Sequence, residues 1–197
     1  MQINFQKQRD LLYTFKLDLI NSIDVILKEL QQELWSPDEA GYNQSSFPTR
    51  FRVRQVRSPV LREIEKYVEH GEFKSLLLTE LYKSQSFGAI WGVGPERIDK
   101  MTFIYGIFTK DLPGYNIRIH TDDRMHVVQG MIYFIPTDDP DQSTIFYTSL
   151  EGNNPMRIST GPGAGYFAAN TNNGWHTGKN ASTQDRYSLI FGIRLNL

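Results

Sequence analysis

Residues 101–140 have the sequence MTFIYGIFTKDLPGYNIRIHTDDRMHVVQGMIYFIPTDDP. Short runs rich in Ile, Val, Tyr and Phe alternate in this stretch with turn-forming groups such as Leu112-Pro113-Gly114 and Thr137-Asp138-Asp139-Pro140. The same texture continues to the C-terminus, and it is typical of an all-β sandwich or barrel. The candidate strands are Thr102 to Phe108, Tyr115 to His120, Val127 to Ile135, Thr144 to Thr148, Gly165 to Ala169 and Arg186 to Leu195.

The residues before Ser84 have a helical pattern instead. From Leu11 to Leu34 apolar residues recur at three- and four-residue steps, which predicts an amphipathic helix that packs on the sheet. Ser58 followed by Pro59 predicts the N-cap and the first residue of a second helix. The expected helices therefore span residues 11–34, 59–68 and 73–83, and an alternating stretch at 51–57 predicts one strand between the first two.

The length of 197 residues fits a single domain with a substantial core. We expect one domain over residues 1–197, in which residues 1–84 form a helical support region and residues 85–197 form the β-rich core. The fold class expected from these patterns is mainly β with N-terminal helices.

Composition excludes several classes of protein. The formal net charge is -1, which gives no global electrostatic reason to expect a nucleic-acid or membrane partner. The chain has no Cys, which removes disulfides, zinc fingers and cysteine hydrolases. The sequence has no secretory signal pattern and no apolar run of membrane-spanning length, so we expect a soluble, cytoplasmic protein.

Three residues suggest a metal site. His120 and Asp122 stand two residues apart at the end of a predicted strand, so their side chains point to the same side, and His176 follows a later strand. Two imidazoles and one carboxylate can occupy one face of an octahedral iron(II) ion and leave the other face open.

A carboxylate-binding pair follows the distal histidine. Arg186 lies ten residues after His176 and opens the last predicted strand. Its planar guanidinium matches a carboxylate, and Ser188, two residues further on, faces the same side and can add a hydrogen bond.

The order and spacing of these residues resemble those of the iron(II)/2-oxoglutarate dioxygenase superfamily over roughly residues 102–195. The Arg-x-Ser pair at Arg186 and Ser188 looks like that of the plant-type and small-molecule hydroxylase branches. The sequence around the His-x-Asp motif is similar to that of small bacterial and phage members. The resemblance implies a double-stranded β-helix, a cupin-like jelly roll that would form the catalytic core over residues 85–197. It further implies Fe(II) bound by His120, Asp122 and His176, with the distal carboxylate of 2-oxoglutarate on Arg186 and Ser188. The activity it implies is hydroxylation of a substrate, with O2 and 2-oxoglutarate consumed and succinate and CO2 released.

Three branches of the superfamily carry other residues at the corresponding positions, which makes the chain less similar to them. Arg186 stands where the collagen-type prolyl 4-hydroxylases usually carry Lys, and Ser188 stands where the nucleic-acid demethylase branch has Asn. Asp122 is the carboxylate that radical halogenases of this fold lack, so the resemblance favours hydroxylation.

Several alternatives remain open at this point. The same fold can serve a cupin-like protein that binds a ligand without turnover, and Arg50, Arg52, Arg54 and Arg57 leave room for a nucleic-acid or ribosomal-protein hydroxylase. The substrate is expected to be a small molecule, an amino acid or a peptidyl residue. The sequence defines neither the identity of the substrate nor the oligomeric state of the protein. Six further residues are candidates for contacts with the cosubstrate or the substrate: Tyr105, Tyr115, Tyr133, His126, Trp91 and Trp175. For the two tryptophans, packing in the core is an equally good explanation.

Overall fold

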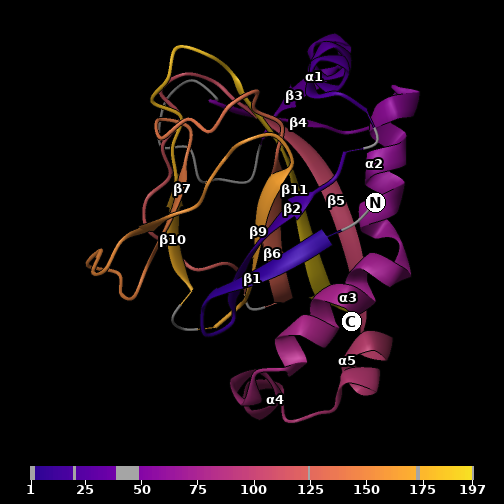
Figure 1. The fold of residues 1–197 in the computed structure, drawn as a ribbon, viewed down its shortest axis with the longest axis vertical. Coiled ribbons are helices and arrows are strands. Elements are labelled where there is room, and N and C mark those ends of the chain that lie inside the picture. The colour runs from indigo at the N-terminus through magenta and orange to yellow at the C-terminus, as the bar shows by residue number, and fades with distance from the viewer. Residues whose placement is uncertain (1–2, 20, 39–48, 124, 172–173, 197) are drawn as a thin grey trace.

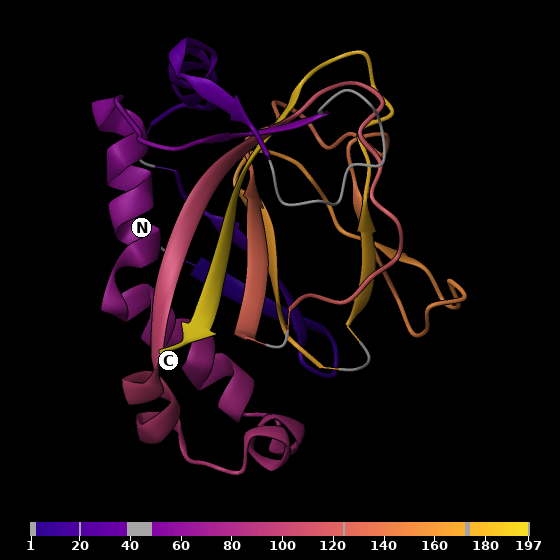
Figure 2. The same cartoon turned by 180° about the vertical axis from the view of Figure 1, so that it is seen from behind.

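The computed structural model describes residues 3–19, 21–38, 49–123, 125–171 and 174–196. Its elements form three layers, in which helices cover one face of a large sheet and a small sheet lies against the opposite face (Figures 1 and 2). The helices are α1 (Ile23–Gln32), α2 (Pro59–Glu69), α3 (Gly71–Tyr82), α4 (Gln85–Trp91) and α5 (Pro95–Met101).

The large sheet contains eight strands in the order β1-β2-β9-β6-β11-β5-β4-β3, and every neighbouring pair is antiparallel. The small sheet has the order β10-β7-β8 and is also antiparallel. The strands of the large sheet are β1 (Ile3–Arg9), β2 (Leu12–Leu17), β3 (Trp35–Pro37), β4 (Arg50–Val53), β5 (Thr102–Asp111), β6 (His126–Tyr133), β9 (Ala164–Ala169) and β11 (Arg186–Leu195). Those of the small sheet are β7 (Thr144–Tyr147), β8 (Met156–Arg157) and β10 (Trp175–Gly178).

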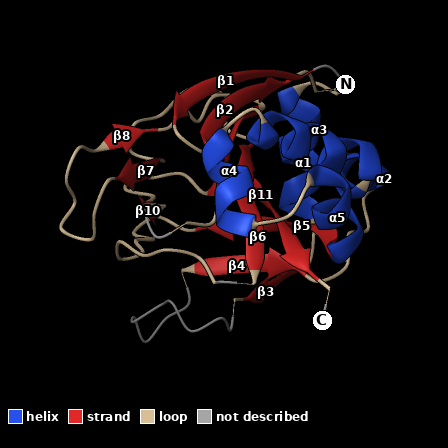
Figure 3. Cartoon of the chain, turned by 90° about the horizontal axis from the view of Figure 1, so that it is seen from below, coloured by secondary structure: helices blue, strands red, loops and turns tan. Residues whose placement is uncertain are grey.

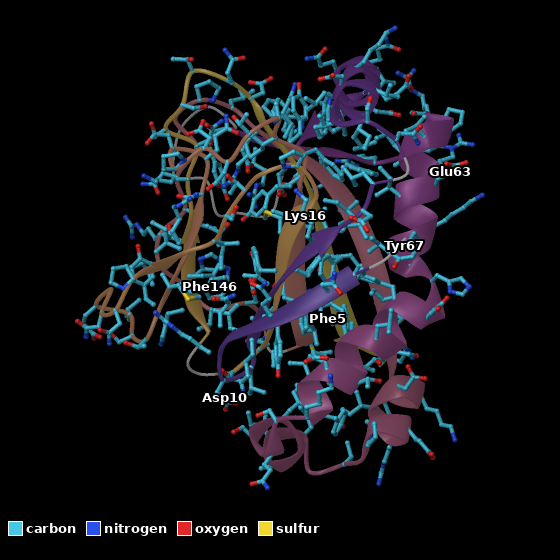
Figure 4. The ribbon with its side chains drawn as sticks, in the orientation of Figure 1. Phe5, Asp10, Lys16, Glu63, Tyr67 and Phe146 are labelled. Carbon is cyan, nitrogen blue, oxygen red and sulfur yellow. The ribbon has the colours of Figure 1, made fainter. Side chains whose placement is uncertain are left out.

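The two faces of the large sheet have different roles because successive side chains of a strand alternate between them. On one face, Phe108, Leu189 and Phe191 pack with the helices in the main apolar core, and Figure 3 shows the helices gathered on this side. Figure 4 labels Phe5 and Tyr67 on the same side and Phe146 on the small sheet. A second apolar cluster, which includes Phe146, packs between the two sheets.

The helix predicted from Leu11 to Leu34 is wrong in its first half. Residues 12–17 are strand β2, in which Tyr13, Phe15 and Leu17 face the helices at a spacing of two residues. Leu12 packs into the cluster between the sheets, so both faces of β2 carry apolar residues and their combined pattern imitates a helical stripe. The helix itself begins at Ile23, after Ser22, whose hydroxyl accepts a hydrogen bond from the Val25 N–H at 3.4 Å.

The other predicted elements have mixed outcomes. Helices α2, with Ser58 as N-cap and Pro59 at its first turn, and α3 are confirmed, as are strands β5, β6, β7, β9 and β11. The strand at 51–57 ends at Val53, and the segment 115–120 forms only isolated bridges at Asn116 and His120. The sequence patterns missed β1, β3, β8, β10 and the short helices α4 and α5, so strands also precede residue 84 and helices also follow it. None of the helices in the described part of the chain is long and apolar enough to cross a membrane.

Candidate metal centre

The three predicted metal-binding side chains come together at one place between the two sheets. The backbone of His120 pairs with that of His176 on β10, with N–H to C=O distances of 3.0 and 2.9 Å, which places the two imidazole rings 4.4 Å apart. Asp122 Oδ1 lies 3.9 Å from His120 Nε2 and 3.8 Å from His176 Nε2. One donor atom of each residue lies within 4.8 Å of the other two, which suits a shared metal ion.

The imidazole rings are oriented for binding through Nε2. His120 Nδ1 lies 2.8 Å from the Arg118 carbonyl oxygen, and His176 Nδ1 lies 3.0 Å from that of Gly174. Each Nδ1 therefore donates its proton to a carbonyl, which leaves the lone pair on Nε2, on the side of Asp122. Burial lowers the pKa of His120, and the neighbouring His176 lowers it further, so His120 is held in the neutral form that a metal needs. The residues present thus fit an iron(II) ion.

Gln129 on β6 fixes the carboxylate of the triad. The orientation of its amide that satisfies both the oxygen and the nitrogen turns the nitrogen towards Asp122, where it donates to both carboxylate oxygens, at 2.7 Å to Oδ1 and 2.5 Å to Oδ2. The amide thereby restricts the rotation of Asp122 and withdraws charge from it, which is how residues behind a metal ligand tune the metal site.

A cavity of about 540 Å³ lies beside this triad and runs along the face of the large sheet that is turned away from the helices. The triad residues are part of its wall. Towards the N-terminal end of β5 its wall includes Phe103 and Tyr105, and towards the C-terminal end it includes Thr109 and Arg186. We call the first part the mouth and the second the closed end, because Phe103 is 44% exposed whereas Arg186 is fully buried.

At the closed end Arg186 is bound to a carboxylate of the protein itself. Its Nε and Nη2 donate to Asp111 Oδ2 at 2.9 and 2.5 Å. Arg50 on β4 binds the same carboxylate, with Nε 2.6 Å from Oδ1 and Nη2 2.9 Å from Oδ2. Burial raises the pKa of Asp111, but the positive charges of Arg50 and Arg186 outweigh this effect and hold it below its usual value. Asp111 is therefore an anion shared by two cations.

The remaining polar groups of the closed end are hydroxyls. Ser188 Oγ lies 2.8 Å from Thr109 Oγ1, and it is the threonine that forms part of the cavity wall. Thr144 and Tyr166 form part of the cavity wall, and Tyr133, which is not among the described lining residues, donates to Thr144 Oγ1 at 2.6 Å. Burial raises the pKa of Tyr133 to about 12, so this phenol stays protonated at neutral pH. The binding of 2-oxoglutarate by Ser188 stays a prediction.

The mouth contains two side-chain pairs, one between Tyr105 and His126 and one between Arg194 and Asp123. Tyr105 Oη lies 2.8 Å from His126 Nε2, and the Tyr105 ring crosses the backbone of Gly192, where a Cβ atom would lie 2.7 Å from the ring. Arg194 Nη2 lies 3.8 Å from Asp123 Oδ2, and both side chains are partly exposed. Ion pairs of this kind contribute little to stability.

The other candidate residues lie elsewhere or are paired. The described residues that line the cavity do not include Trp91, which packs against Phe87 on α4, or Trp175 on β10. Arg52 binds Asp38, and Arg57 lies 3.7 Å from Glu33.

The sequence patterns do not indicate Asp111, Thr144 or Gln129 as site residues, and they do not connect Arg50 with Arg186. Asp111 had a signal, because it follows Tyr105, Ile107 and Thr109 at steps of two and so belongs to the cavity face of β5. Gln129 had none, since an amide in a strand is usually solvated.

No family model and no curated protein matches the sequence. Solved structures do match. A prolyl-4-hydroxylase from Pseudomonas putida has a TM-score of 0.62 and 12% identity, over 95% of this chain and 94% of that chain. A prolyl hydroxylase from Trichoplax adhaerens, in complex with a peptide fragment of hypoxia inducible factor, has a TM-score of 0.60 and 12% identity, over 94% and 84%. HygX from Streptomyces hygroscopicus, with nickel and 2-oxoglutarate bound, has a TM-score of 0.56 and 11% identity, over 95% and 84%.

The chain shares the fold of these proteins. The predicted mainly β class with a double-stranded β-helix is thereby confirmed.

Proposed function

We propose that this protein is an oxygenase that uses Fe(II), 2-oxoglutarate and O2 to hydroxylate a small molecule, an amino acid or a peptidyl residue. The observation that carries the proposal is the pairing of two sites in one cavity. A His-Asp-His group lies between the sheets, and a buried arginine cluster lies at the closed end of the same cavity. A 2-oxo acid with a second carboxylate needs both.

In this proposal His120, Asp122 and His176 would hold the iron at the wall of the cavity. The bound iron would supply O2 activation coupled to the oxidative decarboxylation of 2-oxoglutarate. Arg186 would orient the distal carboxylate of the cosubstrate, and Thr109 and Tyr115 would add polar contacts in the wall. Phe146 packs 5.2 Å from the ring of His176 and helps to exclude water from that side.

The similar structures support this assignment without naming the substrate. One of them was solved with a 2-oxoglutarate molecule and a nickel ion, and another with a bound peptide. A peptide or a small molecule would also reach the iron of this protein through the mouth, past Phe103 and Tyr105.

The test is the release of succinate from 2-oxoglutarate by aerobic, Fe(II)-loaded protein without added substrate. Slow, Fe(II)-dependent succinate formation is expected in the wild type, and none in Asp122→Ala. If folded wild-type protein with bound iron and 2-oxoglutarate releases no succinate in the presence of peptide and small-molecule candidates, a cupin-like binding protein becomes the better description.

The nucleic-acid or ribosomal-protein version of this hydroxylase stays a separate prediction. Arg50, Arg52 and Arg57 each pair with a carboxylate, so their charges are partly compensated. Salt-sensitive binding to oligonucleotides would support it, and its absence at low ionic strength would remove it.

A further inference from the structure

The closed end of the cavity contains one more arginine than a single carboxylate anchor requires. Arg50 comes from β4, the strand that pairs with β5, and its backbone lies opposite Asp111. Its side chain is 15% exposed and forms part of the cavity wall. The Arg50 guanidinium stacks on the ring of Tyr115 at 4.3 Å, and that of Arg186 lies 5.4 Å from the same ring.

The hydrogen bonds of Arg186 leave it little capacity for a ligand. A guanidinium has five N–H groups. Arg186 uses two on Asp111 and two on the carbonyl oxygens of Ser143 and Lys179, so one N–H of Nη2 remains. A Cβ atom at Gly178 would lie 3.3 Å from this nitrogen, so glycine leaves room beside it. A two-pronged bond to an incoming carboxylate is therefore closed to Arg186.

Arg50 has the capacity that Arg186 lacks. It uses Nε and one N–H of Nη2 on Asp111, so three of its five N–H groups have no acceptor among the described residues. The charges lead to the same result. Asp111 neutralises one of the two arginines, and Asp38 in the same wall is paired with Arg52, so a net charge of +1 remains.

We infer that Arg50 is a second residue of the cosubstrate anchor, binding the distal carboxylate of 2-oxoglutarate together with the free N–H of Arg186, while Asp111 holds both guanidinium groups in place. This inference rests on the proposed function. Without Arg50 the cluster becomes a neutral Arg186–Asp111 pair, which attracts an anion weakly in a buried site.

Calorimetric titration of anaerobic, Fe(II)-loaded protein with two 2-oxo acids tests this role. One is 2-oxoglutarate. The other is 2-oxopentanoate, which has the same carbon chain with a methyl group in place of the distal carboxylate. Arg50→Gln is expected to weaken 2-oxoglutarate binding roughly 10- to 100-fold, as loss of a charged hydrogen bond does, and to leave 2-oxopentanoate binding within about twofold.

Two further variants complete the experiment. Arg157→Gln removes an arginine that binds Asp138 outside the cavity wall, so it should change neither affinity. Arg50→Lys keeps the charge without the planar fork, and it should lie between the wild type and Arg50→Gln. If Arg50→Gln does not fold, Arg50→Lys carries the test alone, with a loss expected for 2-oxoglutarate only.

The outcomes separate the two proposals. Wild-type affinity for 2-oxoglutarate in Arg50→Gln, or an equal loss for both acids, would overturn the role of Arg50 and leave the proposed function intact. Failure of the iron-loaded wild type to bind 2-oxoglutarate would instead overturn the proposed function, and the inference with it.

Discussion

The closed end and the mouth of the cavity each contain an arginine–aspartate pair on adjacent segments, but the two pairs differ in every physical respect. Arg186 and Asp111 are fully buried and 2.5 Å apart. Arg194 and Asp123 are 39% and 54% exposed and 3.8 Å apart. Both arginines belong to β11, at opposite ends of that strand.

The contrast shows at which end of the cavity the charged side chains are held in one arrangement and at which end they can change partners. Charges in a low-dielectric interior have to be paired with good geometry, whereas exposed charges can exchange partners with water or with a ligand. The closed end therefore suits one constant ligand, which under the proposed function would be the cosubstrate. The mouth suits the variable partner, the substrate, and substrate preference is expected to depend on residues there.

The largest difference is expected when each aspartate is removed. Asp111→Ala leaves two buried arginines around one missing carboxylate, and it should lower the free energy of unfolding by about 3–5 kcal/mol in urea denaturation at pH 7. Asp123→Ala, at the mouth, should lower it by about 1 kcal/mol or less. Equal losses in the two variants would remove the distinction between the ends.

The stability difference between the wild type and Asp111→Ala is expected to depend on pH. Because the pKa of Asp111 is below its usual value of 3.8 in the folded protein, its contribution to stability is present above pH 3.8 and is lost as the pH falls below it. The difference between the wild type and Asp111→Ala should therefore be constant from pH 7 to about pH 5 and shrink only in stronger acid. A difference that already shrinks above pH 5 would contradict the depressed pKa.

The sequence predicts the metal triad because strand ends and residue order are local features. His120 and Asp122 are only two residues apart in the sequence, and the isolated bridge between His120 and His176 brings the distal histidine to them. The partner of Arg186 is a different kind of problem. It depends on the register that places Arg50 and Arg186 opposite Asp111 on two different neighbours of β5, and register is fixed by packing of the whole sheet.

The errors in the fold have a related cause. Leu12 and Phe15 lie on opposite faces of strand β2 but imitate a three-residue helical step, and the helices α4 and α5 are too short for a periodic pattern to emerge. The mouth was least predictable. The contact between Tyr105 and His126 joins two strands that are both neighbours of β11, and no local pattern indicates that these side chains meet above Gly192.

An intermediate effect is expected at the metal centre, between the two ends. Gln129→Leu removes both hydrogen bonds to Asp122 and should weaken Fe(II) binding about 10- to 100-fold in anaerobic equilibrium titration. Gln8→Leu, a change of the same type on exposed β1, serves as the control and should leave the iron affinity unchanged. An unaltered iron affinity in Gln129→Leu would show that Asp122 needs no support from β6.

The smallest effect is expected from two glycines whose strand positions face opposite sides of the sheet. Gly192→Ala adds a methyl group 2.7 Å from the Tyr105 ring, which has to move, at a cost of about 1 kcal/mol in thermal unfolding. Gly106→Ala on β5 meets its neighbours at an ordinary 3.5 Å and should be neutral or slightly stabilising. A Gly192→Ala variant as stable as Gly106→Ala would mean that the mouth tolerates repacking around Tyr105 at no cost.

The most direct test of the whole account is anaerobic titration of the protein with Fe(II), first alone and then with 2-oxoglutarate, followed by visible absorption. The account expects a weak metal-to-ligand charge-transfer band that requires both additions and disappears in His176→Ala. A folded wild-type protein that never develops this band would contradict the claim that the triad and the arginine cluster serve one iron-bound 2-oxo acid.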